Sequence, residues 1–283
     1  MSQPKKLVIE PLFPIKPPSN IQNILVIGCG GTGSYVIPNL VRLLSNGKQS
    51  VCLTIADADT VETKNLIRQN FIKSDVGKNK AEALANRYSS AFGMQIQYLP
   101  KYLESSDDIG SALKNARVNN INHGGSAPLI ISCVDNIKSR SFMVEALQRY
   151  YPSCGFLVDC GNEAAEGQVL LTCITSNDDV STGIYRTPHL FEVFPELVER
   201  AKSDKLSSEL NCAEMAESSA QFGFVNLNAA TIALNFIHEL LSGTPISTYM
   251  VDFSIKNKFS QRTLTKSSLQ SWTIPGAKLK LPK

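Results

Sequence analysis

The sequence has little net charge, no long hydrophobic run and no secretory leader pattern. Its 28 Lys and Arg residues outnumber its 25 Asp and Glu residues by three, too small a surplus to indicate a nucleic-acid or membrane partner. No stretch of about 18 apolar residues is free of interruption, so no membrane span is expected. The apolar run at residues 7–9 is too short for a signal-peptide core. The sequence therefore predicts a soluble cytoplasmic protein.

Closely spaced cysteines are also absent. The seven cysteines stand singly along the chain, and no Cys-x-x-Cys pair occurs. A disulfide framework needs a dense, even set in a small secreted domain, and structural zinc commonly binds such pairs. Neither disulfides nor zinc are therefore expected. The 43% of hydrophobic residues in 283 excludes wholesale disorder and is enough to bury a sizeable core.

Short β-branched runs alternate with helical patterns over much of the chain. Residues 1–20 hold five of the 14 prolines and predict an extended N-terminal arm. Residues 21–174 then predict an α/β fold, a doubly wound, Rossmann-like, mostly parallel sheet. Residues 175–283 predict a crossover segment with a short helix near 190–201, a long helix at 224–241, and closing strands at 249–255 and 262–265 of the same domain.

A glycine cluster lies between the first expected strand and the helix after it. Gly28, Gly30, Gly31 and Gly33 permit a tight turn, and they let backbone N–H groups approach phosphate oxygens at the helix N-terminus. Asp57 ends the next strand, where a carboxylate can accept hydrogen bonds from a ribose. The pattern indicates a nucleotide without distinguishing NAD from ATP. By motif frequency alone it favours a dinucleotide oxidoreductase.

The residues that follow Asp57 favour a triphosphate instead. Asn65 and Arg68 are three residues apart, so one helical turn would aim both the same way, and Lys80 lies just inside the next helix. A dehydrogenase needs no such convergence, whereas a triphosphate does, because charge must be neutralised as pyrophosphate leaves. Asp135 ends the fourth buried strand, where one carboxylate beside phosphates suits Mg²⁺.

Taken in order, these blocks resemble the ubiquitin-activating-like adenylating enzymes, the superfamily of ThiF, MoeB and HesA. The shared blocks are Gly-x-Gly-Gly-x-Gly, Asp-x-Asp-x-Val, Asn-Leu-x-Arg-Gln, Asp-x-Gly-x-x-Lys-Ala and a strand ending in Asp-Asn. The resemblance covers roughly residues 21–243 and is nearest to a compact bacterial branch found with mobile-element gene sets. Members bind ATP and Mg²⁺ and adenylate the C-terminal carboxylate of a small ubiquitin-like or sulfur-carrier protein, releasing pyrophosphate.

The resemblance also implies roles for individual residues. The implied contacts are the loop from Gly28 to Gly33 with the phosphates, Asp57 with the ribose, Asn65, Arg68 and Lys80 with the phosphates, Asp135 with Mg²⁺, and Asn136 beside the nucleotide. Arg68, Lys80 and Asp135 are thereby the expected catalytic groups. Cys212 stands where the family often has a cysteine, which in some members captures the acyl group and in others is dispensable. A homodimer is implied by the family as well.

Two departures from the family pattern leave alternatives open. Typical members begin with an Arg-Tyr-x-Arg-Gln-like segment that lends an arginine to the partner subunit's ATP site, but this arm offers only lysines. The family's paired zinc-binding cysteines are missing too, so the C-terminal region must be held by packing alone. One alternative is an NAD-dependent oxidoreductase, which would be indifferent to Lys80. The other is a catalytically degenerate member that binds a nucleotide or partner without turnover.

Overall fold

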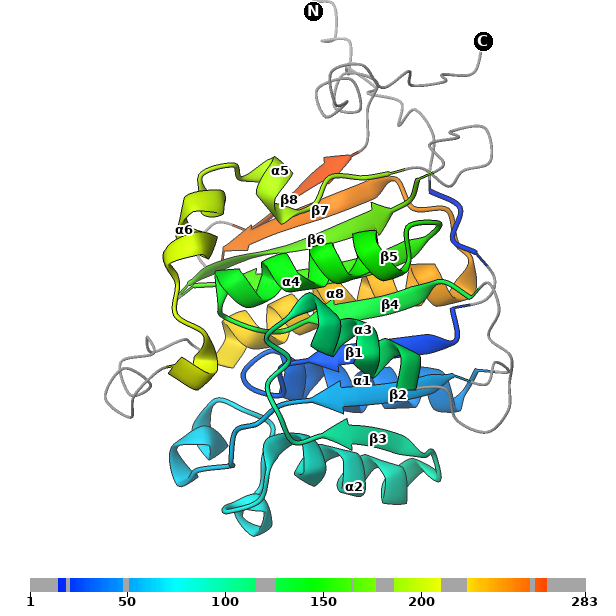
Figure 1. Cartoon of the computed structure of the whole chain (residues 1–283). Helices are drawn as coiled ribbons and strands as arrows, with labels where there is room; N and C mark the ends of the chain where they lie inside the picture. Colours follow the sequence, from blue (N-terminus) through cyan, green and yellow to red (C-terminus); the bar gives the residue numbers. More distant parts are fainter. Residues whose placement is uncertain are drawn as a thin grey trace, which may run out of the picture.

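Eight strands form one sheet in the computed structural model of the protein (Figure 1). The structure describes residues 15–18, 21–47, 51–115, 126–163, 165–176, 186–209 and 223–254, and the backbone of 258–263. The strands are β1 (Asn23–Ile27), β2 (Cys52–Ala56), β3 (Ile96–Leu99), β4 (Pro128–Ser132), β5 (Gly155–Asn162), β6 (Glu166–Ile174), β7 (Thr248–Ser254) and β8 (Lys258–Thr263). Their order across the sheet is β3-β2-β1-β4-β5-β6-β7-β8.

Strands β1 to β5 run parallel, and β6 to β8 continue the sheet antiparallel. The register places Asn23 of β1 between Cys52 of β2 and Pro128 of β4. All five residues of β1 and of β4 are buried, as expected where helices cover both faces of a parallel sheet. The predicted α/β class and its doubly wound, mostly parallel sheet are therefore confirmed.

Helices cover both faces of the sheet. They are α1 (Gly33–Ser45), α2 (Lys80–Phe92), α3 (Ser106–Asn115), α4 (Ile137–Tyr150), α5 (Leu190–Val193), α6 (Leu197–Ser203) and α8 (Gly223–Ser242), with short 3-10 turns η1 (Thr63–Ile67), η2 (Lys73–Asp75) and η4 (Ser207–Glu209). Helices α3 and α4 pack together in front of the sheet in Figure 1, and α1, α2 and α8 lie behind it. None of the helices in the described ranges has the length and hydrophobicity that a membrane span requires.

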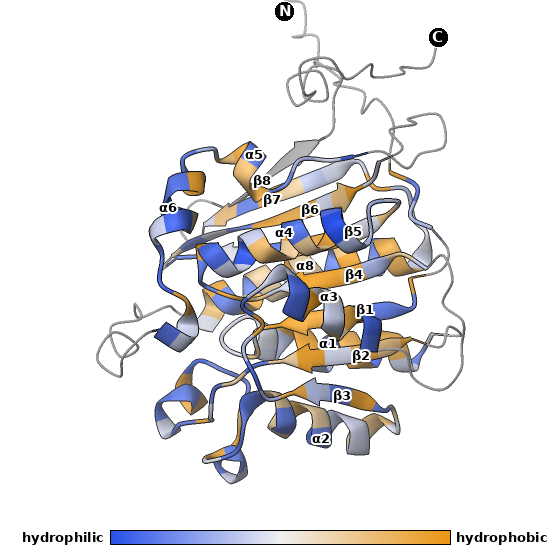
Figure 2. Ribbon diagram, in the orientation of Figure 1, coloured by the Kyte–Doolittle hydropathy of each residue, from blue (hydrophilic) through white to orange (hydrophobic). Residues whose placement is uncertain are grey.

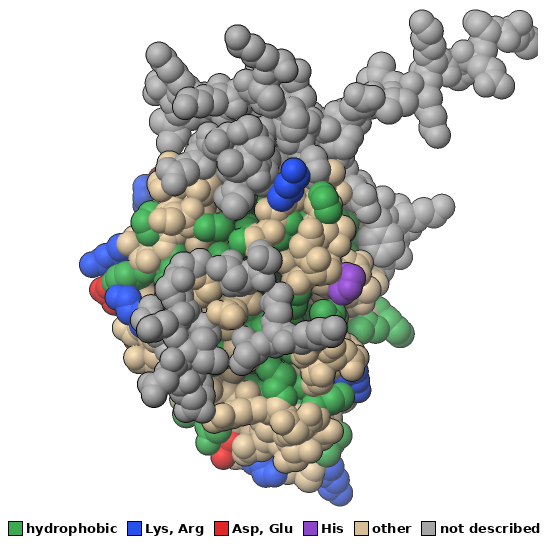
Figure 3. Space-filling view, turned by 90° about the vertical axis from the view of Figure 1, so that its right-hand side faces the viewer, with side chains coloured by type: hydrophobic (Ala, Val, Ile, Leu, Met, Phe, Trp, Pro, Cys, Tyr) green, Lys and Arg blue, Asp and Glu red, His purple; other side chains and the backbone are tan. Residues whose placement is uncertain are grey.

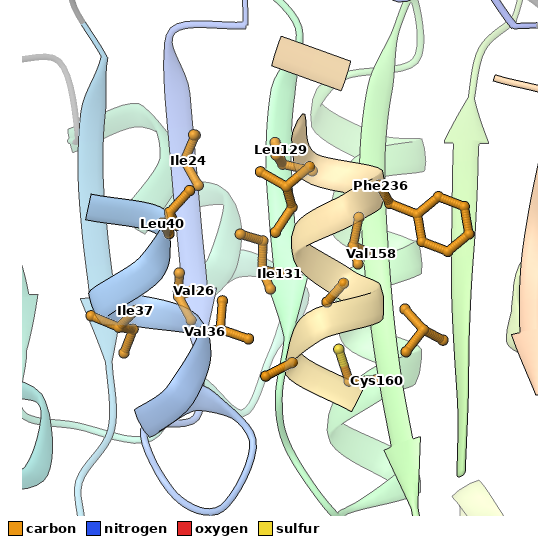
Figure 4. Packing of buried hydrophobic residues seen from close by; sticks show 14 of the residues in the cluster. Ile24, Val26, Val36, Ile37, Leu40, Leu129, Ile131, Val158, Cys160 and Phe236 are labelled. Carbon is orange, nitrogen blue, oxygen red and sulfur yellow. The ribbon is translucent and has the colours of Figure 1, made fainter. Parts of the chain in front are cut away.

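The larger core lies between the sheet and the layer of α1 and α8 (Figure 4). Alternate strand residues point into it and meet apolar side chains of the two helices: Ile24, Val26, Leu129, Ile131 and Val158 from the strands, and Val36, Ile37, Leu40 and Phe236 from the helices. The intervening residues Leu25 and Ile130 face α3 and α4 on the other side. Because both faces are covered, the central strands are apolar along their length, as the hydropathy colouring in Figure 2 shows.

The C-terminal part follows the prediction with two corrections. The predicted long helix is α8, and the two closing strands correspond to β7 and β8, but β8 spans Lys258–Thr263 and so begins four residues before the predicted 262–265. The single helix predicted near 190–201 is instead two short helices, because Pro195 lies between α5 and α6. Proline has no N–H and forces the preceding residue out of the helical region, and Phe194 has φ −130° and ψ 77°.

Candidate functional site

Three of the predicted site residues, Gly28, Asp57 and Asp135, lie at the carboxyl ends of β1, β2 and β4. These strands are neighbours in the sheet, and their carboxyl ends lie on its left-hand side in Figure 1. Gly28 follows β1, Asp57 follows β2 and Asp135 lies just beyond β4. The Gly28 N–H donates to the carbonyl of the last β2 residue at 2.9 Å, and the Cys133 N–H donates to the carbonyl of the last β1 residue at 2.8 Å. The structure thus brings three separate sequence blocks together at the carboxyl ends of neighbouring strands.

The glycine loop is shaped by close backbone contacts. Gly28 has φ +94°, a conformation that favours glycine, and a Cβ there would lie 2.6 Å from the Cys133 carbonyl oxygen. A Cβ on Gly33 would meet the Gly28 carbonyl oxygen well inside the 3.0 Å that real Cβ atoms keep. At Gly30 the nearest atom to a Cβ would be 3.9 Å away. Packing therefore requires glycine at positions 28 and 33 and leaves position 30 open.

A buried asparagine of α8 holds the loop from the other side. Asn226 is fully buried, and its Oδ1 accepts hydrogen bonds from Thr32 Oγ1 at 3.3 Å and from Asn162 Nδ2. A Cβ on Gly31 would lie 2.7 Å from the same amide. The glycine loop, the end of β5 and the start of α8 are thus joined, and sequence reasoning had not singled out Asn226.

The N-terminus of α1 has only part of its backbone N–H groups available for an anion. Its N-cap residue, Thr32, makes no side-chain cap, and the first turn contains no acidic residue. The N–H groups of Ser34 and Tyr35 already donate to the carbonyls of Gly30 and Thr32, at 3.1 and 3.0 Å, so an anion would use the N–H groups that precede Ser34. The first N–H groups of a helix have no partner within the helix, and the helix dipole makes this end partly positive. A phosphate is a suitable partner for such groups.

Asp57 is a buried residue at the carboxyl end of β2, next to the glycine loop. It is 8% exposed, and its two carboxylate oxygens accept hydrogen bonds from the Cys29 N–H at 2.6 Å and from the Asp59 N–H at 2.8 Å. Burial raises the pKa of Asp57 to about 6, with Asp59 adding to the rise while Lys80 and the two N–H groups oppose it. Asp57 is thus fixed against the glycine loop by the Cys29 N–H.

Lys80, the first residue of α2, pairs with an acidic residue of the site. Its side chain is 8% exposed, and Nζ lies 2.7 Å from Asp59 Oδ2. Tyr102 donates its hydroxyl hydrogen to Asp59 Oδ1. Burial favours a higher pKa of Asp59, but Lys80 and Tyr102 outweigh it and hold that pKa below its usual range. Sequence reasoning had predicted Lys80 but assigned no role to Asp59 or Tyr102.

The turn η1 carries Asn65 and Arg68. Asn65 is buried, and its Oδ1 accepts a hydrogen bond from the Glu62 N–H at 2.8 Å. The Arg68 N–H donates to the Asn65 carbonyl at 3.2 Å, which closes the predicted turn, and the Arg68 side chain is half-buried. A Cβ on Gly223, at the start of α8, would lie 3.9 Å from the Arg68 Cα. Asn65 shapes the turn, and Arg68 is left at its end beside α8.

Just beyond η1, Asn70 attaches the chain to α1 by hydrogen bonding to a backbone carbonyl that lacks its usual helical donor because of a proline. Pro38 lies inside α1 and has no N–H to donate to the Ser34 carbonyl. Asn70 Nδ2 donates to that carbonyl at 3.2 Å, and the Asn70 N–H donates to Ser34 Oγ at 2.9 Å. This proline thereby provides an attachment point for the segment that carries Arg68.

Asp135 and Asn136 lie between β4 and α4. Asp135 is exposed. Asn136 is the N-cap of α4: its Oδ1 accepts a hydrogen bond from the Ser139 N–H at 2.9 Å, and its Nδ2 donates to the Lys205 carbonyl. The amide of Asn136 is therefore engaged by the protein itself, whereas the Asp135 carboxylate faces solvent at the site.

Arg140, one turn into α4, ties the Asp135 loop to β5. Its Nη2 donates to the carbonyls of Val134 and Cys160, both at 2.9 Å. Its Nε lies 3.7 Å from Asp159 Oδ1, and the two residues are 4% and 2% exposed. Among the described residues, neither carboxylate oxygen of Asp159 has a hydrogen-bond partner. Arg140 is thus a support of the site that sequence reasoning missed.

Metal and thiol chemistry are constrained by the same geometry. No three His, Cys, Asp or Glu side chains come together as a metal cage within the described ranges. The single exposed carboxylate of Asp135 fits Mg²⁺ if phosphate oxygens complete the shell, since Mg²⁺ usually takes one or two carboxylates plus phosphate. Cys29 lies in the glycine loop, but burial raises the pKa of its thiol, which disfavours a nucleophilic role. Cys212 lies outside the described residues.

The strand order β3-β2-β1-β4-β5 and a glycine loop at the first strand–helix turn define a doubly wound, Rossmann-like α/β protein. The ThiF family model matches residues 20–271, and the chain belongs to the ThiF family. It is 32% identical over 152 residues to the NEDD8-activating enzyme E1 catalytic subunit of Saccharomyces cerevisiae, covering 52% of this chain and 46% of that protein. It is 30% identical over 120 residues to the ubiquitin-like modifier-activating enzyme 5 of Culex quinquefasciatus, covering 42% and 29%. The matched regions span less than half of these relatives.

Solved structures share the fold. Escherichia coli MccB with ATP superposes with a TM-score of 0.57 at 14% identity, covering 87% of this chain and 65% of that one. PaaA superposes with a TM-score of 0.57 at 15% identity, covering 86% and 73%. At such identities the likeness shows the fold alone.

Proposed function

We propose that this chain is an ATP-dependent adenylyltransferase that activates the C-terminal carboxylate of a small ubiquitin-like or sulfur-carrier protein. The observation that carries this proposal is that the glycine loop with the N-terminus of α1, the buried carboxylate of Asp57 and the exposed Asp135 lie at the carboxyl ends of neighbouring strands, with Lys80 held beside them through Asp59. The names of the relatives, an enzyme activating NEDD8 and one activating a ubiquitin-like modifier, support the class of substrate.

In the proposed reaction, an oxygen of the carrier's carboxylate attacks the α-phosphorus of ATP. The bond from that phosphorus to the bridging oxygen breaks, and pyrophosphate leaves with the electron pair. The N-terminus of α1 holds phosphate oxygens, Asp57 accepts hydrogen bonds from the ribose, and Arg68 and Lys80 neutralise charge that develops on the leaving group. Asp135 would hold Mg²⁺, which supplies further neutralisation of phosphate charge. Capture of the acyl group on Cys212 and assembly as a homodimer belong to the proposal.

The first test is nucleotide binding measured by calorimetry, with ATP in the presence and absence of Mg²⁺ and with NAD. We expect Mg²⁺-dependent binding of ATP and no binding of NAD. Asp135→Asn removes the charged ligand and is expected to weaken binding of ATP with Mg²⁺ by at least about tenfold, with little change in binding of ATP alone. The matched control is Glu199→Gln, a 79% exposed carboxylate on α6.

NAD binding without a response to Asp135→Asn would contradict the proposed function and favour the oxidoreductase alternative. Binding of ATP without exchange of labelled pyrophosphate, even when a carrier with a free C-terminus is supplied, would favour the degenerate member. Either result alone would contradict the proposed adenylyltransferase activity.

A second prediction concerns pH. Because burial raises the pKa of Asp57 to about 6, the empty protein has this carboxyl mostly protonated at pH 5 and mostly ionised at pH 7. If ribose binding requires the carboxylate, ATP affinity should fall about tenfold from pH 7 to pH 5. ATP titrates in the same range, so the measurement is the ratio between the wild type and Asp57→Asn. An identical pH dependence in both proteins would exclude Asp57 as the ribose acceptor.

A further inference from the structure

The side chain of Lys80 is linked to two residues, Asp59 and Tyr102, to which the proposed reaction gives no role. Asp59 follows Asp57 by two positions, and Tyr102 belongs to the segment between β3 and α3. One carboxylate oxygen of Asp59 accepts from Lys80 Nζ, and the other accepts from the Tyr102 hydroxyl. The three side chains therefore form one hydrogen-bonded chain, with Asp59 in the middle.

Backbone hydrogen bonds fix Asp59 independently of its side chain. Its N–H donates to Asp57 Oδ1 at 2.8 Å, and its carbonyl accepts from the Lys80 N–H at 2.8 Å. Asn79 Nδ2 donates to the carbonyls of both Asp57 and Asp59, at 2.8 and 3.2 Å. The start of α2 is thus attached to the end of β2, and Asp59 has little freedom to move away from Lys80.

The side chain of Lys80 is much more deeply buried than the side chain of Asp59 that it contacts. The Lys80 side chain is 8% exposed, whereas that of Asp59 is 41% exposed. A nearly buried ammonium requires a close partner, because burying an unpaired charge is expensive. An ammonium has three protons, and Asp59 takes one of them, which leaves two for an incoming acceptor. Tyr102 holds the carboxylate by its second oxygen, so the ammonium is fixed in place at the site.

We propose that Asp59 and Tyr102 are positioning residues that hold the Lys80 ammonium where phosphate oxygens reach it. The part of this proposal that concerns phosphate rests on the proposed function. The part that concerns Lys80 itself does not, because the hydrogen-bonded chain is present without a nucleotide. The two parts are therefore tested separately.

The first experiment measures how fast an amine-acylating reagent modifies Lys80 in the full chain without nucleotide, with mass spectrometry to locate the product. Lys64, which is 54% exposed, is the internal reference. Tyr102→Phe removes the hydroxyl that holds Asp59 and is expected to raise the rate at Lys80 about tenfold relative to Lys64, and Asp59→Asn to raise it further. Tyr98→Phe, at a tyrosine that is 39% exposed on β3, is the control and should leave the ratio unchanged. An unchanged ratio in both site variants would overturn the proposal.

The second experiment is a double-mutant cycle on affinity for ATP with Mg²⁺, using Tyr102→Phe, Lys80→Ala and the pair, with thermal unfolding to show that each variant is folded. If Tyr102 acts through Lys80, the pair should bind no more weakly than Lys80→Ala alone. Additive losses would mean that Tyr102 acts on the nucleotide or the fold directly, and would overturn the positioning role. If the wild type binds no ATP, the proposed function fails, while the acylation rates still decide whether Tyr102 positions Lys80.

Discussion

Gly33→Ala is expected to destabilise the protein by about 3 kcal/mol or more, enough to leave little folded chain at 37 °C if the wild type has ordinary stability. The added methyl would overlap the carbonyl oxygen of Gly28, which belongs to the backbone and cannot rotate away. Moving that carbonyl would also displace Gly28, whose own N–H and φ are set by contacts with β2 and β4. Urea unfolding followed by circular dichroism measures the loss.

Gly30→Ala supplies the control within the same loop. Its Cβ would have no heavy atom closer than 3.9 Å, and its backbone is outside the left-handed region, so unfolding should change by no more than about 0.5 kcal/mol. Under the proposed function, however, the methyl would stand where phosphate oxygens approach the loop, and ATP affinity should fall while stability holds. Equal stability of the two variants would show that the loop can relax around Gly33, contrary to the backbone contact described.

Arg140→Met is expected to destabilise the protein by about 3–5 kcal/mol, because it leaves a buried charge without a partner. Asp159 is 2% exposed and, within the described part of the chain, its oxygens have no hydrogen-bond donor, so the guanidinium is the cation that offsets its charge. The substitution also removes donors from the carbonyls of Val134 and Cys160. Chemical unfolding at pH 7 measures the effect.

Two further variants separate the charge from the packing. Arg149→Met, on the same helix but 56% exposed, should change stability by less than about 1 kcal/mol. Adding Asp159→Leu to Arg140→Met removes the isolated charge and should recover most of the loss, since replacing both partners of a buried pair by apolar groups is often close to neutral. A double variant as unstable as Arg140→Met would contradict the electrostatic explanation and point to the two carbonyls.

The arrangement of the sheet could be predicted because its pattern is local. Each central strand is a short apolar run, and each run is followed by a helical pattern, which together favour parallel strands with covered faces. Helix α3 was not predicted, since its residues alternate small, acidic and apolar types without a long stripe. Pro195 could have predicted the break between α5 and α6, but the helical patterns on its two sides together favoured a single helix.

The site shows the same division between local and distant information. Gly28 and Asp57 were found because each directly follows a strand that the pattern reveals. Asp135 was found because it follows the same apolar run as β4, although β4 itself ends three residues earlier, at Ser132. Tyr102 and Asn226 could not be found in this way, since their partners lie 43 and 194 residues away in the sequence. Arg140 did leave a signal: it stands on the apolar stripe of α4, three residues before the buried Met143.

The glycine loop has a further consequence for the order in which the protein is made. The loop follows the first strand, yet the residue beneath Gly28 is Cys133 and the side chain against Gly31 is that of Asn226. On the ribosome, the loop emerges long before either contact exists, and α8 is among the last helices to be synthesised. A nascent chain therefore carries the motif without the enclosure that shapes it until Asn226 has been synthesised. Under the proposed function, a nucleotide can therefore assist only a late stage of folding, after the parallel strands have paired across long stretches of chain.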